Sequence, residues 1–390
     1  MSRLLIVTYY KYPDGDAGAV RQYSFAKLYK KAGFDVTVAG MGDYTDFKTK
    51  DYNGIPYISF RNAKNSIFYK MLNYLGFKYR LRAFLKIFGD CDYIQVVDIP
   101  PNALFYLKKY AKKHNIKLIY DSVEWYSPEQ FVKGKYAVPY ILKEKYNTKW
   151  IDNQFSVIAI SSFLEKHFKS RGIDTVRIPV IMDIESIPFK KNTQDKKTVF
   201  LYAGSPGKKD YLAEIVKGFS MLDKELLSGF ELQLLGIEKN QLTELCGVEQ
   251  SAAEYLGDSL VCLGRLPHRE VIDRLSGADF TVLLRSERLR YAKAGFPTKV
   301  VESLATATPV ITNLTSDLDK YLKDGYNSII VRECSPEAFA EALKNALSLS
   351  VADKTQMYTN ARKTAKEYFD YRVYADAITN FLDKEVNDEI

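Results

Sequence analysis

Runs of apolar residues alternate with amphipathic stretches along the first half of the chain. The run RLLIVTYY is followed by the turn-rich KYPDGDAG, and AVRQYSFAKLYKKAG then carries apolar residues at helical spacing up to a glycine. Buried strands separated by helices predict parallel βαβ units with right-handed crossovers. The strands expected in this half lie at residues 3–10, 34–40, 92–98, 116–122 and 155–161.

The same alternation restarts after a Lys/Asn/Gln-rich stretch, FKKNTQDKK (189–197), which we interpret as a linker. We therefore expect an α/β protein with two Rossmann-like, doubly wound domains that face one cleft, at 1–190 and 191–369, followed by a helical segment at 370–390. In such sheets ligands bind beyond the carboxyl ends of the strands. The strands expected in the second half lie at 198–204, 231–236, 260–264, 279–285, 308–313 and 328–331, and the last helix at 370–386.

Composition narrows the class of protein. The chain has 390 residues, enough for two domains, and its 46% hydrophobic and 27% charged residues are ordinary for a globular protein. No apolar run approaches the roughly 18 residues of a membrane-spanning helix, and the N-terminus lacks the pattern of a signal peptide. The 4 cysteines form no CxxC pair and the 3 histidines are scattered. We expect a cytoplasmic protein without a metal site.

The net charge of +8 is unevenly distributed. Residues 1–190 hold 30 Lys and Arg against 18 Asp and Glu, a surplus of 12, whereas residues 191–390 hold 26 against 30, a deficit of 4. A basic half joined to a mildly acidic half indicates two domains with different partners.

The stretch GFPTKVVESLA (295–305) is the sharpest local signal. Pro297 suits the first turn of a helix, whose N-terminal N–H groups favour an anion such as phosphate, and Lys293 and Lys299 add positive charge. Glu302 could accept hydrogen bonds from the two hydroxyls of a ribose. Alternatively, Glu302 is there because a carboxylate is favourable near a helix N-terminus; this stretch alone leaves both interpretations open.

A second loop, YAGSPGKKD (202–210), ends a strand at a glycine. Lys208 and Lys209 open the next helix, where a lysine can neutralise a diphosphate, although a solvated lysine pair is common at turns.

Four other residues lie at the ends of strands or the starts of helices. His268 is near a helix start, where a lone histidine is more often a capping or surface residue. Arg285 ends a buried strand and could simply pair with Glu287. Gly18 and Ala19 would let a ligand approach the backbone closely, but the stretch is not GxGxxG, and turn glycines explain it equally well.

Residues 61–88 differ in kind from these loops. They hold seven Lys or Arg, seven Phe or Tyr and no acidic residue. Basic residues mixed with aromatic ones favour a helix at an anionic membrane surface. A solvated helix whose aromatic side chains pack inward is the next interpretation, and nucleic acid is a distant third that we do not adopt as a partner.

Taken together, these motifs resemble the retaining glycosyltransferases of family 4, which have the two-domain GT-B fold. The resemblance extends over nearly the whole chain, and GFPTKVVESLATATPVITN is its most specific part. The other stretches that carry it are DSVEWYSPEQF (121–131), ISSFLEKHF (160–168), VRIPVIMD (176–183), FLYAGSPGKKD (200–210) and LGRLPHREVIDRLSGADFTVLLR (263–285).

The resemblance implies a nucleotide-sugar donor bound to the second domain. Glu302 would bind the ribose, Lys209 with Lys208 the diphosphate, and the backbone of residues 296–298 the sugar-phosphate end. The terminal helix would cross back to the first domain, and neither a metal nor another cofactor is expected. The expected donor-binding residues are Gly18, Ala19, Gly204, Ser205, Lys208, Lys209, His268, Lys293, Gly295, Phe296, Pro297, Thr298, Lys299 and Glu302. The expected catalytic residues are Lys209, Arg285, Asp121 and Glu124, and Asp98, Asp121 and Glu124 are expected on the acceptor side.

Three positions depart from the pattern of the family. Ala294 stands where many members have the first of two glutamates, Ser205 where an arginine is usual, and Val123 where a histidine often occurs.

We expect a metal-independent retaining transferase that acts with a UDP-, GDP- or dTDP-sugar on a glycan or lipid-linked acceptor, in surface or capsular polysaccharide or lipopolysaccharide biosynthesis at the inner membrane face. The alternatives are a non-catalytic nucleotide-sugar-binding relative and a nucleotide-sugar epimerase of the same fold.

Overall fold

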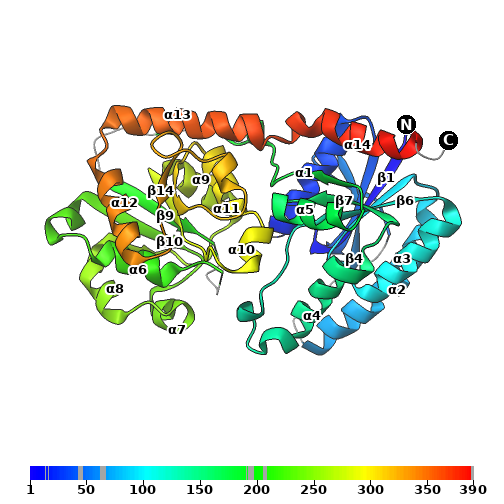
Figure 1. Cartoon of the computed structure of the whole chain (residues 1–390), viewed down its shortest axis with the longest axis horizontal. Helices are drawn as coiled ribbons and strands as arrows, with labels where there is room; N and C mark the ends of the chain where they lie inside the picture. The colour runs from blue at the N-terminus through cyan, green and yellow to red at the C-terminus, as the bar shows by residue number, and fades with distance from the viewer. Residues whose placement is uncertain are drawn as a thin grey trace. The chain divides into compact units, whose positions relative to one another are not determined.

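The chain divides into two compact units in a computed structural model, which describes residues 1–13, 15, 17–42, 47–61, 67–189, 191, 197–204 and 209–387 (Figure 1). Unit 1 comprises Met1–Tyr126, Lys135–Asp183 and Tyr371–Ile390, and unit 2 comprises Ser127–Gly134 and Ile184–Asp370. The short segment Ser127–Gly134 thus groups with the second unit, and the end of the chain groups with the first.

Unit 1 is built on an eight-stranded sheet with the order β3-β4-β2-β1-β5-β6-β7-β8. Neighbouring strands run parallel except for β3 and β4, which are antiparallel. The strands are β1 (Arg3–Lys11), β2 (Asp35–Gly42), β3 (Lys50–Tyr52), β4 (Ile55–Arg61), β5 (Tyr93–Val97), β6 (Lys117–Ser122), β7 (Phe155–Ala159) and β8 (Thr175–Arg177).

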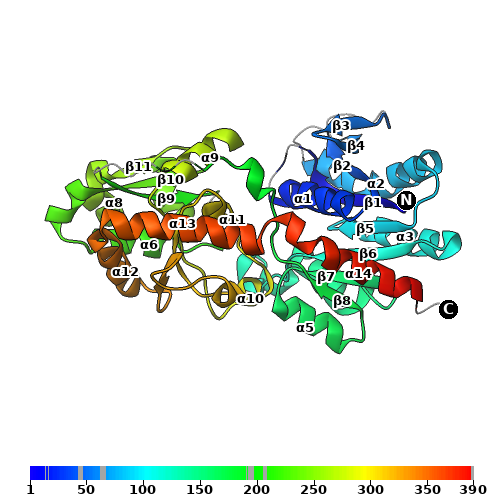
Figure 2. The same ribbon diagram turned by 90° about the horizontal axis from the view of Figure 1, so that it is seen from above.

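Helices cover the sheet of unit 1, and the side chains of β1 show how both of its faces are buried. Leu4 and Ile6 belong to the same core cluster as Phe25 of α1 and Ile378 of α14, while Leu5, the residue between them, is equally buried. Figure 2 shows α2 beside α3, and α14 runs near α1 and β8. The helices of unit 1 are α1 (Ala17–Lys31), α2 (Ile67–Phe88), α3 (Pro101–His114), α4 (Val138–Lys145), α5 (Ser162–Ser170) and α14 (Ala375–Asn387).

The hairpin of β3 and β4 was not anticipated from the alternation of strands and helices. Asn53 and Gly54 join its two strands, with φ values of 50° and 79°. An Asn-Gly pair is the preferred two-residue hairpin turn because both central positions need positive φ. The sequence therefore carried a signal for this antiparallel edge, and the expectation of purely parallel units was wrong there.

Unit 2 has a six-stranded sheet, entirely parallel, with the order β11-β10-β9-β12-β13-β14. Its strands are β9 (Thr198–Ala203), β10 (Phe230–Leu235), β11 (Leu260–Cys262), β12 (Phe280–Leu283), β13 (Val310–Asn313) and β14 (Ser328–Val331). Its helices are α6 (Leu212–Ser220), α7 (Leu242–Cys246), α8 (Gln250–Leu256), α9 (His268–Gly277), α10 (Arg290–Ala294), α11 (Thr298–Ala305), α12 (Pro336–Ser348) and α13 (Val351–Tyr368).

Both faces of this sheet are also buried. Phe200 of β9 stacks on Phe280 with ring centroids 5.8 Å apart and packs edge-on against Phe219 of α6. Leu201, which points the other way, packs with Leu275 of α9. Continuous apolar strands are typical of parallel sheets covered by helices on both sides. The two Rossmann-like α/β domains predicted from the sequence are thereby confirmed.

The last helix differs slightly from the prediction for 370–386. A 3-10 turn over Tyr371–Tyr374 precedes α14, so the chain does not form one helix from residue 370. Tyr93 of β5 donates a 3.5 Å hydrogen bond to the carbonyl of Leu382, which ties α14 to the sheet of unit 1.

Candidate functional site

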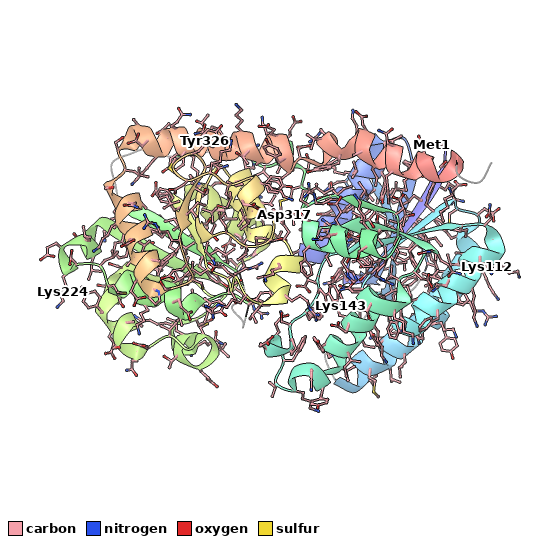
Figure 3. The ribbon with its side chains drawn as sticks, in the orientation of Figure 1. Met1, Lys112, Lys143, Lys224, Asp317 and Tyr326 are labelled. Carbon is pink, nitrogen blue, oxygen red and sulfur yellow. The ribbon has the colours of Figure 1, made fainter. Side chains whose placement is uncertain are left out.

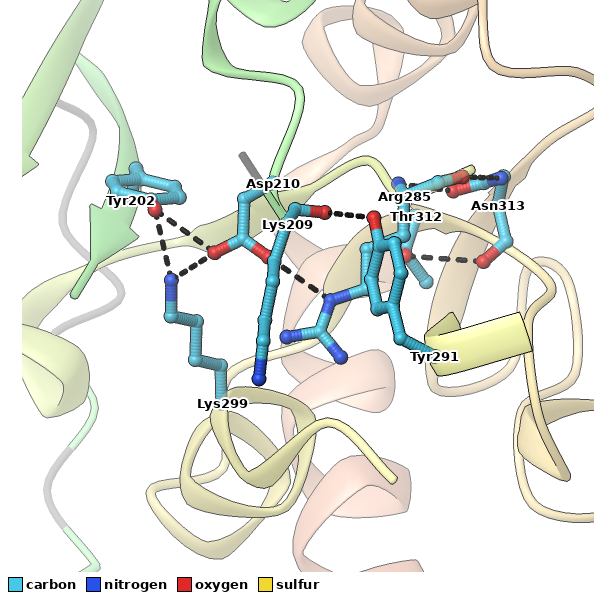
Figure 4. Close-up of polar contacts among 8 residues, drawn as sticks. All are labelled: Tyr202, Lys209, Asp210, Arg285, Tyr291, Lys299, Thr312 and Asn313. Carbon is cyan, nitrogen blue, oxygen red and sulfur yellow. Dashed lines mark hydrogen bonds and ion pairs between the residues drawn. The ribbon is translucent and has the colours of Figure 1, made fainter. Parts of the chain in front are cut away.

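Four polar side chains meet at the carboxyl ends of two adjacent strands of unit 2. Tyr202 lies near the end of β9, and Asp210 follows the loop after that strand. Arg285 comes just after β12, and Lys299 is in the first turn of α11. Parallel strands place all their carboxyl ends at one edge, which is where this fold binds ligands. Figure 4 shows the side chains of Tyr202, Arg285 and Lys299 converging on the Asp210 carboxylate.

Asp210 is the hub of this cluster. Its Oδ1 accepts a 3.0 Å hydrogen bond from Arg285 Nε, and its Oδ2 forms an ion pair with Lys299 Nζ. Tyr202 Oη donates to Asp210 Oδ2 at 2.9 Å and accepts from Lys299 Nζ at 2.9 Å. The Asp210 side chain is 6% exposed, whereas Arg285 and Lys299 keep 14% and 23% of their side-chain surface.

The electrostatics of the cluster favour an anion. Burial alone would raise the pKa of Asp210, but Lys299 and Arg285 hold that pKa well below its usual value. Burial lowers the pKa of Lys299, and Asp210 opposes that shift. Two cations therefore share one carboxylate, which leaves these four residues with a net positive charge.

A second set of bonds fixes the backbone around Arg285. The amide N–H of Arg285 donates to Asn313 Oδ1 at 3.0 Å, and Asn313 Nδ2 donates to the carbonyl of Arg285 at 2.7 Å. The same Asn313 amide also donates to Glu287 at 2.8 Å. The alternative that Arg285 pairs with Glu287 was thus wrong, because Glu287 bonds to Asn313 and the Arg285 guanidinium bonds to Asp210.

A hydrogen bond to its backbone carbonyl holds Lys209 beside this cluster. Tyr291 of α10 donates a 2.6 Å hydrogen bond from its hydroxyl to the carbonyl of Lys209. In Figure 4 the side chains of Lys209 and Arg285 extend in the same direction.

Gly204, which directly follows β9, has no side chain, and Lys299 requires this. Its φ of 147° lies in the region that favours glycine, and a Cβ there would be 2.5 Å from Lys299 Nζ. The lysine therefore reaches Asp210 by crossing the bare backbone of Gly204.

Glu302 lies one turn further along α11, beside a small pocket. Burial raises the pKa of Glu302 to about 7, and Lys299 partly offsets that shift. Leu201, Leu275 and Val310 line the apolar side of the pocket. Within the described part of the chain, no hydrogen bond to the Glu302 carboxylate is found. A half-enclosed carboxylate that is not committed to the protein can accept hydrogen bonds from a ligand.

The start of α11 differs in detail from the prediction. The helix begins at Thr298, so Pro297 occupies the N-cap position and not the first turn. The Phe296 side chain packs on Tyr321 and Phe369, with ring centroids 5.7 Å away in each case, so only its backbone can serve a ligand.

The residues just before α11 are mostly buried. Lys293 is exposed at the end of α10, and Ala294 and Gly295 beside it are buried. Ser205 and Lys208 lie outside the described residues, as does the side chain of His268, whose backbone begins α9.

In unit 1, Asp121 proves to be a structural residue. Its side chain has 0% exposure, and Arg21 donates to it from Nε at 2.9 Å and from Nη2 at 2.8 Å. Gln22 donates a further bond at 3.1 Å. The carboxylate of Asp121 is thus saturated and enclosed, and the catalytic and acceptor-side roles predicted for it were wrong for this reason.

Asp98 and Glu124 lie in a more open cluster at the carboxyl ends of β5 and β6. Asp98 has the unusual φ of 45°, accepts a 2.5 Å hydrogen bond from buried Lys143 and another from the hydroxyl of Tyr10, and keeps 25% of its side-chain surface. Burial, then Asp98, raises the pKa of Tyr10, and burial, then Glu124, raises that of Tyr126. Sequence reasoning missed Lys143, Tyr10 and Tyr126, because nothing in the local sequence distinguishes them from other lysines and tyrosines.

Gly18 and Ala19 occupy the first turn of α1. The ring of Tyr10 lies against Gly18, where a Cβ would be 2.6 Å from the nearest ring atom, and Ala19 is buried. Gly18 therefore has a packing reason to be glycine, and its predicted role toward a donor stays a prediction.

Two Rossmann-like α/β units, each built on a mostly or entirely parallel sheet, define the class of GT-B folds, and comparison with known proteins agrees. Residues 183–364, which include the Asp210 cluster and Glu302, match the family described as glycosyl transferases group 1. A curated protein of Methanocaldococcus jannaschii described as an uncharacterized glycosyltransferase is 20% identical over 240 residues, and the match spans 59% of each protein.

Solved structures show the same fold. Sucrose-phosphate synthase from Thermosynechococcus elongatus matches with a TM-score of 0.75 and 14% identity over 100% of both chains. Anabaena HepE, solved in complex with UDP and glucose, matches with a TM-score of 0.69 and 14% identity over 98% of this chain and 100% of its own. The GT-B fold expected from the resemblance is confirmed.

Proposed function

We propose that this protein is a retaining glycosyltransferase that transfers a sugar from a nucleotide-sugar donor to a glycan or lipid-linked acceptor. One observation carries the proposal. Lys299 and Arg285 lie around Asp210 at the carboxyl edge of the unit 2 sheet, with the uncommitted Glu302 carboxylate one turn from Lys299. Cations beside a free carboxylate match the two ends of a nucleoside diphosphate, whose phosphates are anionic and whose ribose carries two hydroxyls.

The donor would bind to unit 2 with its ribose on Glu302 and its diphosphate near Lys209, Arg285 and Lys299. The backbone N–H groups at the start of α11 would hold the sugar-phosphate end. That HepE of the same fold was solved with UDP supports a uridine nucleotide as the first donor to test. GDP- and dTDP-sugars are the donors to test next.

Catalysis would rest on stabilising the leaving group. When the bond between the sugar and the diphosphate breaks, negative charge develops on the diphosphate, and fixed cations in a partly enclosed site stabilise it. Retention would follow from attack on the same face of the sugar, with the leaving phosphate accepting the proton of the acceptor hydroxyl. This route requires no nucleophile from the protein and no metal.

The acceptor would contact unit 1. Asp98 and Glu124 are its candidate polar contacts, since the Asp98 carboxylate is held in place by Lys143 and yet keeps a quarter of its surface. Asp121 is no longer a candidate.

A lipid-linked acceptor is supported by the outer surface of unit 1. The helix α2 exposes large apolar side chains, and neither α2 nor its neighbour α3 contains an acidic residue. Lys109, Lys112 and Lys113 are exposed on α3, and Figure 3 shows Lys112 extending outward from the end of that helix. The exposed apolar residues of α2 are Tyr69, Met71, Leu72, Leu75, Tyr79 and Ile87.

Apolar side chains beside cations are typical of a helix at an anionic membrane surface. Among the described helices none is long and apolar enough to cross a membrane. We therefore propose peripheral binding at the inner membrane face, in surface or capsular polysaccharide or lipopolysaccharide biosynthesis.

The test is release of nucleoside diphosphate by the purified protein. With UDP-, GDP- and dTDP-sugars and extracted lipid-linked glycans as acceptors, one donor should give acceptor-dependent release and a product that keeps the anomeric configuration, as read by NMR. Binding of a donor by calorimetry without turnover on any acceptor would favour a non-catalytic relative. Interconversion of the donor without an acceptor would favour an epimerase.

The epimerase has less support from the described residues. Such an enzyme would use acid and base groups in its cleft, but His167 bonds to the carbonyl of Asn147 at 2.7 Å and His114 stacks on Tyr110 at the end of α3. Both histidines belong to unit 1, whereas the Asp210 cluster belongs to unit 2.

A further inference from the structure

Asp210 has no expected role in binding a donor, because a carboxylate repels phosphate. It is nevertheless the residue on which the cations of the site depend. Its two oxygens face two different cations from two different elements, Arg285 after β12 and Lys299 in α11. Tyr202 closes the arrangement by bonding to both Asp210 and Lys299.

The hydrogen bonds to Asp210 leave some N–H groups of Arg285 and Lys299 available for a ligand. Arg285 uses only Nε toward Asp210, and its two terminal amino groups make no hydrogen bond within the described ranges, while 14% of its side chain is exposed. The terminal edge of a guanidinium is the part that binds phosphate in a bidentate way. Lys299 uses two of its three N–H donors, on Asp210 and Tyr202, and keeps the third.

We propose that Asp210 is a positioning residue for donor binding, which orients Arg285 and Lys299 so that their remaining N–H groups meet the diphosphate. This proposal rests on the function proposed above and assigns to it a residue that touches neither ribose nor phosphate.

Asp210 has a second effect on Lys299. The charged groups that face Lys299 are Asp210, Arg285 and Glu302. Burial and Arg285 lower the pKa of Lys299, and Asp210 and Glu302 raise it. Without the Asp210 charge, Lys299 would lose its proton at a lower pH than in the wild type, and the site would lose a cation.

Asp210→Asn separates this role from a simple effect of charge. If Asp210 acted only as a nearby negative charge, removing that charge would strengthen the binding of UDP. If Asp210 positions the cations, the variant should bind UDP at least about tenfold more weakly at pH 8, and the ratio of wild-type to variant affinity should shrink as the pH falls toward 6.5. Comparing the two proteins at each pH cancels the titration of UDP itself.

Three controls complete the calorimetric experiment. Uridine, which lacks phosphate, should bind equally to wild type and Asp210→Asn. Asp279→Asn removes another carboxylate at the opposite end of β12, where Asp279 bonds to Tyr358 at 2.5 Å and to the Val199 amide at 2.7 Å, and should leave UDP affinity unchanged. Lys299→Met should lose affinity without recovery at low pH.

The outcomes are distinct for the two proposals. Equal or tighter UDP binding by folded Asp210→Asn would overturn the positioning role while leaving the transferase proposal intact. Wild-type protein that binds none of UDP, GDP and dTDP would overturn the function on which it rests. If Asp210→Asn does not fold, Arg285→Lys provides the second variant, because it keeps the positive charge but loses the guanidinium that bonds to Asp210 and to phosphate at the same time. Undiminished UDP affinity of Arg285→Lys would equally overturn the proposal.

Discussion

Lys299 reaches Asp210 by crossing the backbone of Gly204, where a side chain would lie 2.5 Å from the lysine nitrogen. These two residues are 95 positions apart in the sequence, and each determines which residue type the other can be. The glycine is needed for its missing side chain, and the lysine for its reach to the buried carboxylate.

Gly204→Ala should displace Lys299 from Asp210 and weaken UDP binding by about tenfold or more. The physical reason is that the added methyl group and the nitrogen cannot occupy the same space, and a φ of 147° strains any residue other than glycine. Calorimetry with UDP measures the effect. Gly229→Ala is the matched control, since a Cβ there meets nothing within 4 Å and the glycine has no positive φ. Equal affinities of Gly204→Ala and Gly229→Ala would contradict the packing argument.

Glu302→Gln should change how stability depends on pH. Burial raises the pKa of Glu302 to about 7 from an ordinary value of 4.5, so the folded protein holds this proton more tightly than the unfolded chain. The contribution of Glu302 is therefore fully present below about pH 4.5 and is lost as the pH rises through about 7. The variant should lack this loss and be more stable than wild type at pH 8, by on the order of 1 kcal/mol. Urea unfolding at pH 5, 7 and 8 measures the difference, and identical pH profiles would argue against an enclosed carboxyl group.

The same substitution should weaken the binding of uridine. A carboxylate accepts hydrogen bonds from both ribose hydroxyls, whereas an amide offers one acceptor and a donor. We expect about a tenfold loss of uridine affinity at pH 8 and a smaller loss at pH 6, where most of the wild-type Glu302 is protonated. Unchanged uridine affinity would contradict the proposed role of Glu302 in binding the ribose.

Asp121→Asn should destabilise unit 1 by about 3 to 5 kcal/mol, because it leaves the buried Arg21 guanidinium without its counter-charge. Both tryptophans of the chain, Trp125 and Trp150, belong to unit 1, so their fluorescence follows the unfolding of this unit alone. Asp35→Asn is the control, since Asp35 pairs with Arg3 at 3.6 Å on the surface, and it should cost less than about 1 kcal/mol. A small effect at Asp121 would restore the possibility of a functional role.

Replacing Lys109, Lys112 and Lys113 of α3 by Gln should reduce binding to anionic vesicles. Each basic residue near such a surface contributes about 1 kcal/mol, so three replacements predict roughly a hundredfold loss at low salt. Cosedimentation with phosphatidylserine-containing vesicles measures the loss. The same change at the exposed Lys224, Lys239 and Lys344 of unit 2 is the matched control. Binding of wild-type protein that ignores both lipid charge and salt would exclude the electrostatic part of the proposal.

Much of the fold could be predicted because parallel strands buried on both faces are continuous apolar runs. Each of the eleven strands expected from such runs is present, from β1 to β14. The strands that escaped prediction are β3, β4 and β8, of which β3 and β8 are only three residues long and β3 lies at a sheet edge. Edge strands bury less surface, so their sequences carry a weaker periodic signal.

The site was predictable only in part. The sequence by itself determined that Lys299 and Glu302 lie on one helix in the second half of the chain, since that depends on local order along the chain. The prediction that Lys209 opens a helix was wrong, because α6 begins only at Leu212. Only the tertiary structure decided that Lys299 and Arg285 share Asp210, that Asp121 is enclosed by Arg21, and that Lys143 holds Asp98. The physical reason is that strength and direction of an ion pair depend on burial and on a distance of a few ångströms, and both arise only when strands distant in sequence become neighbours in a sheet.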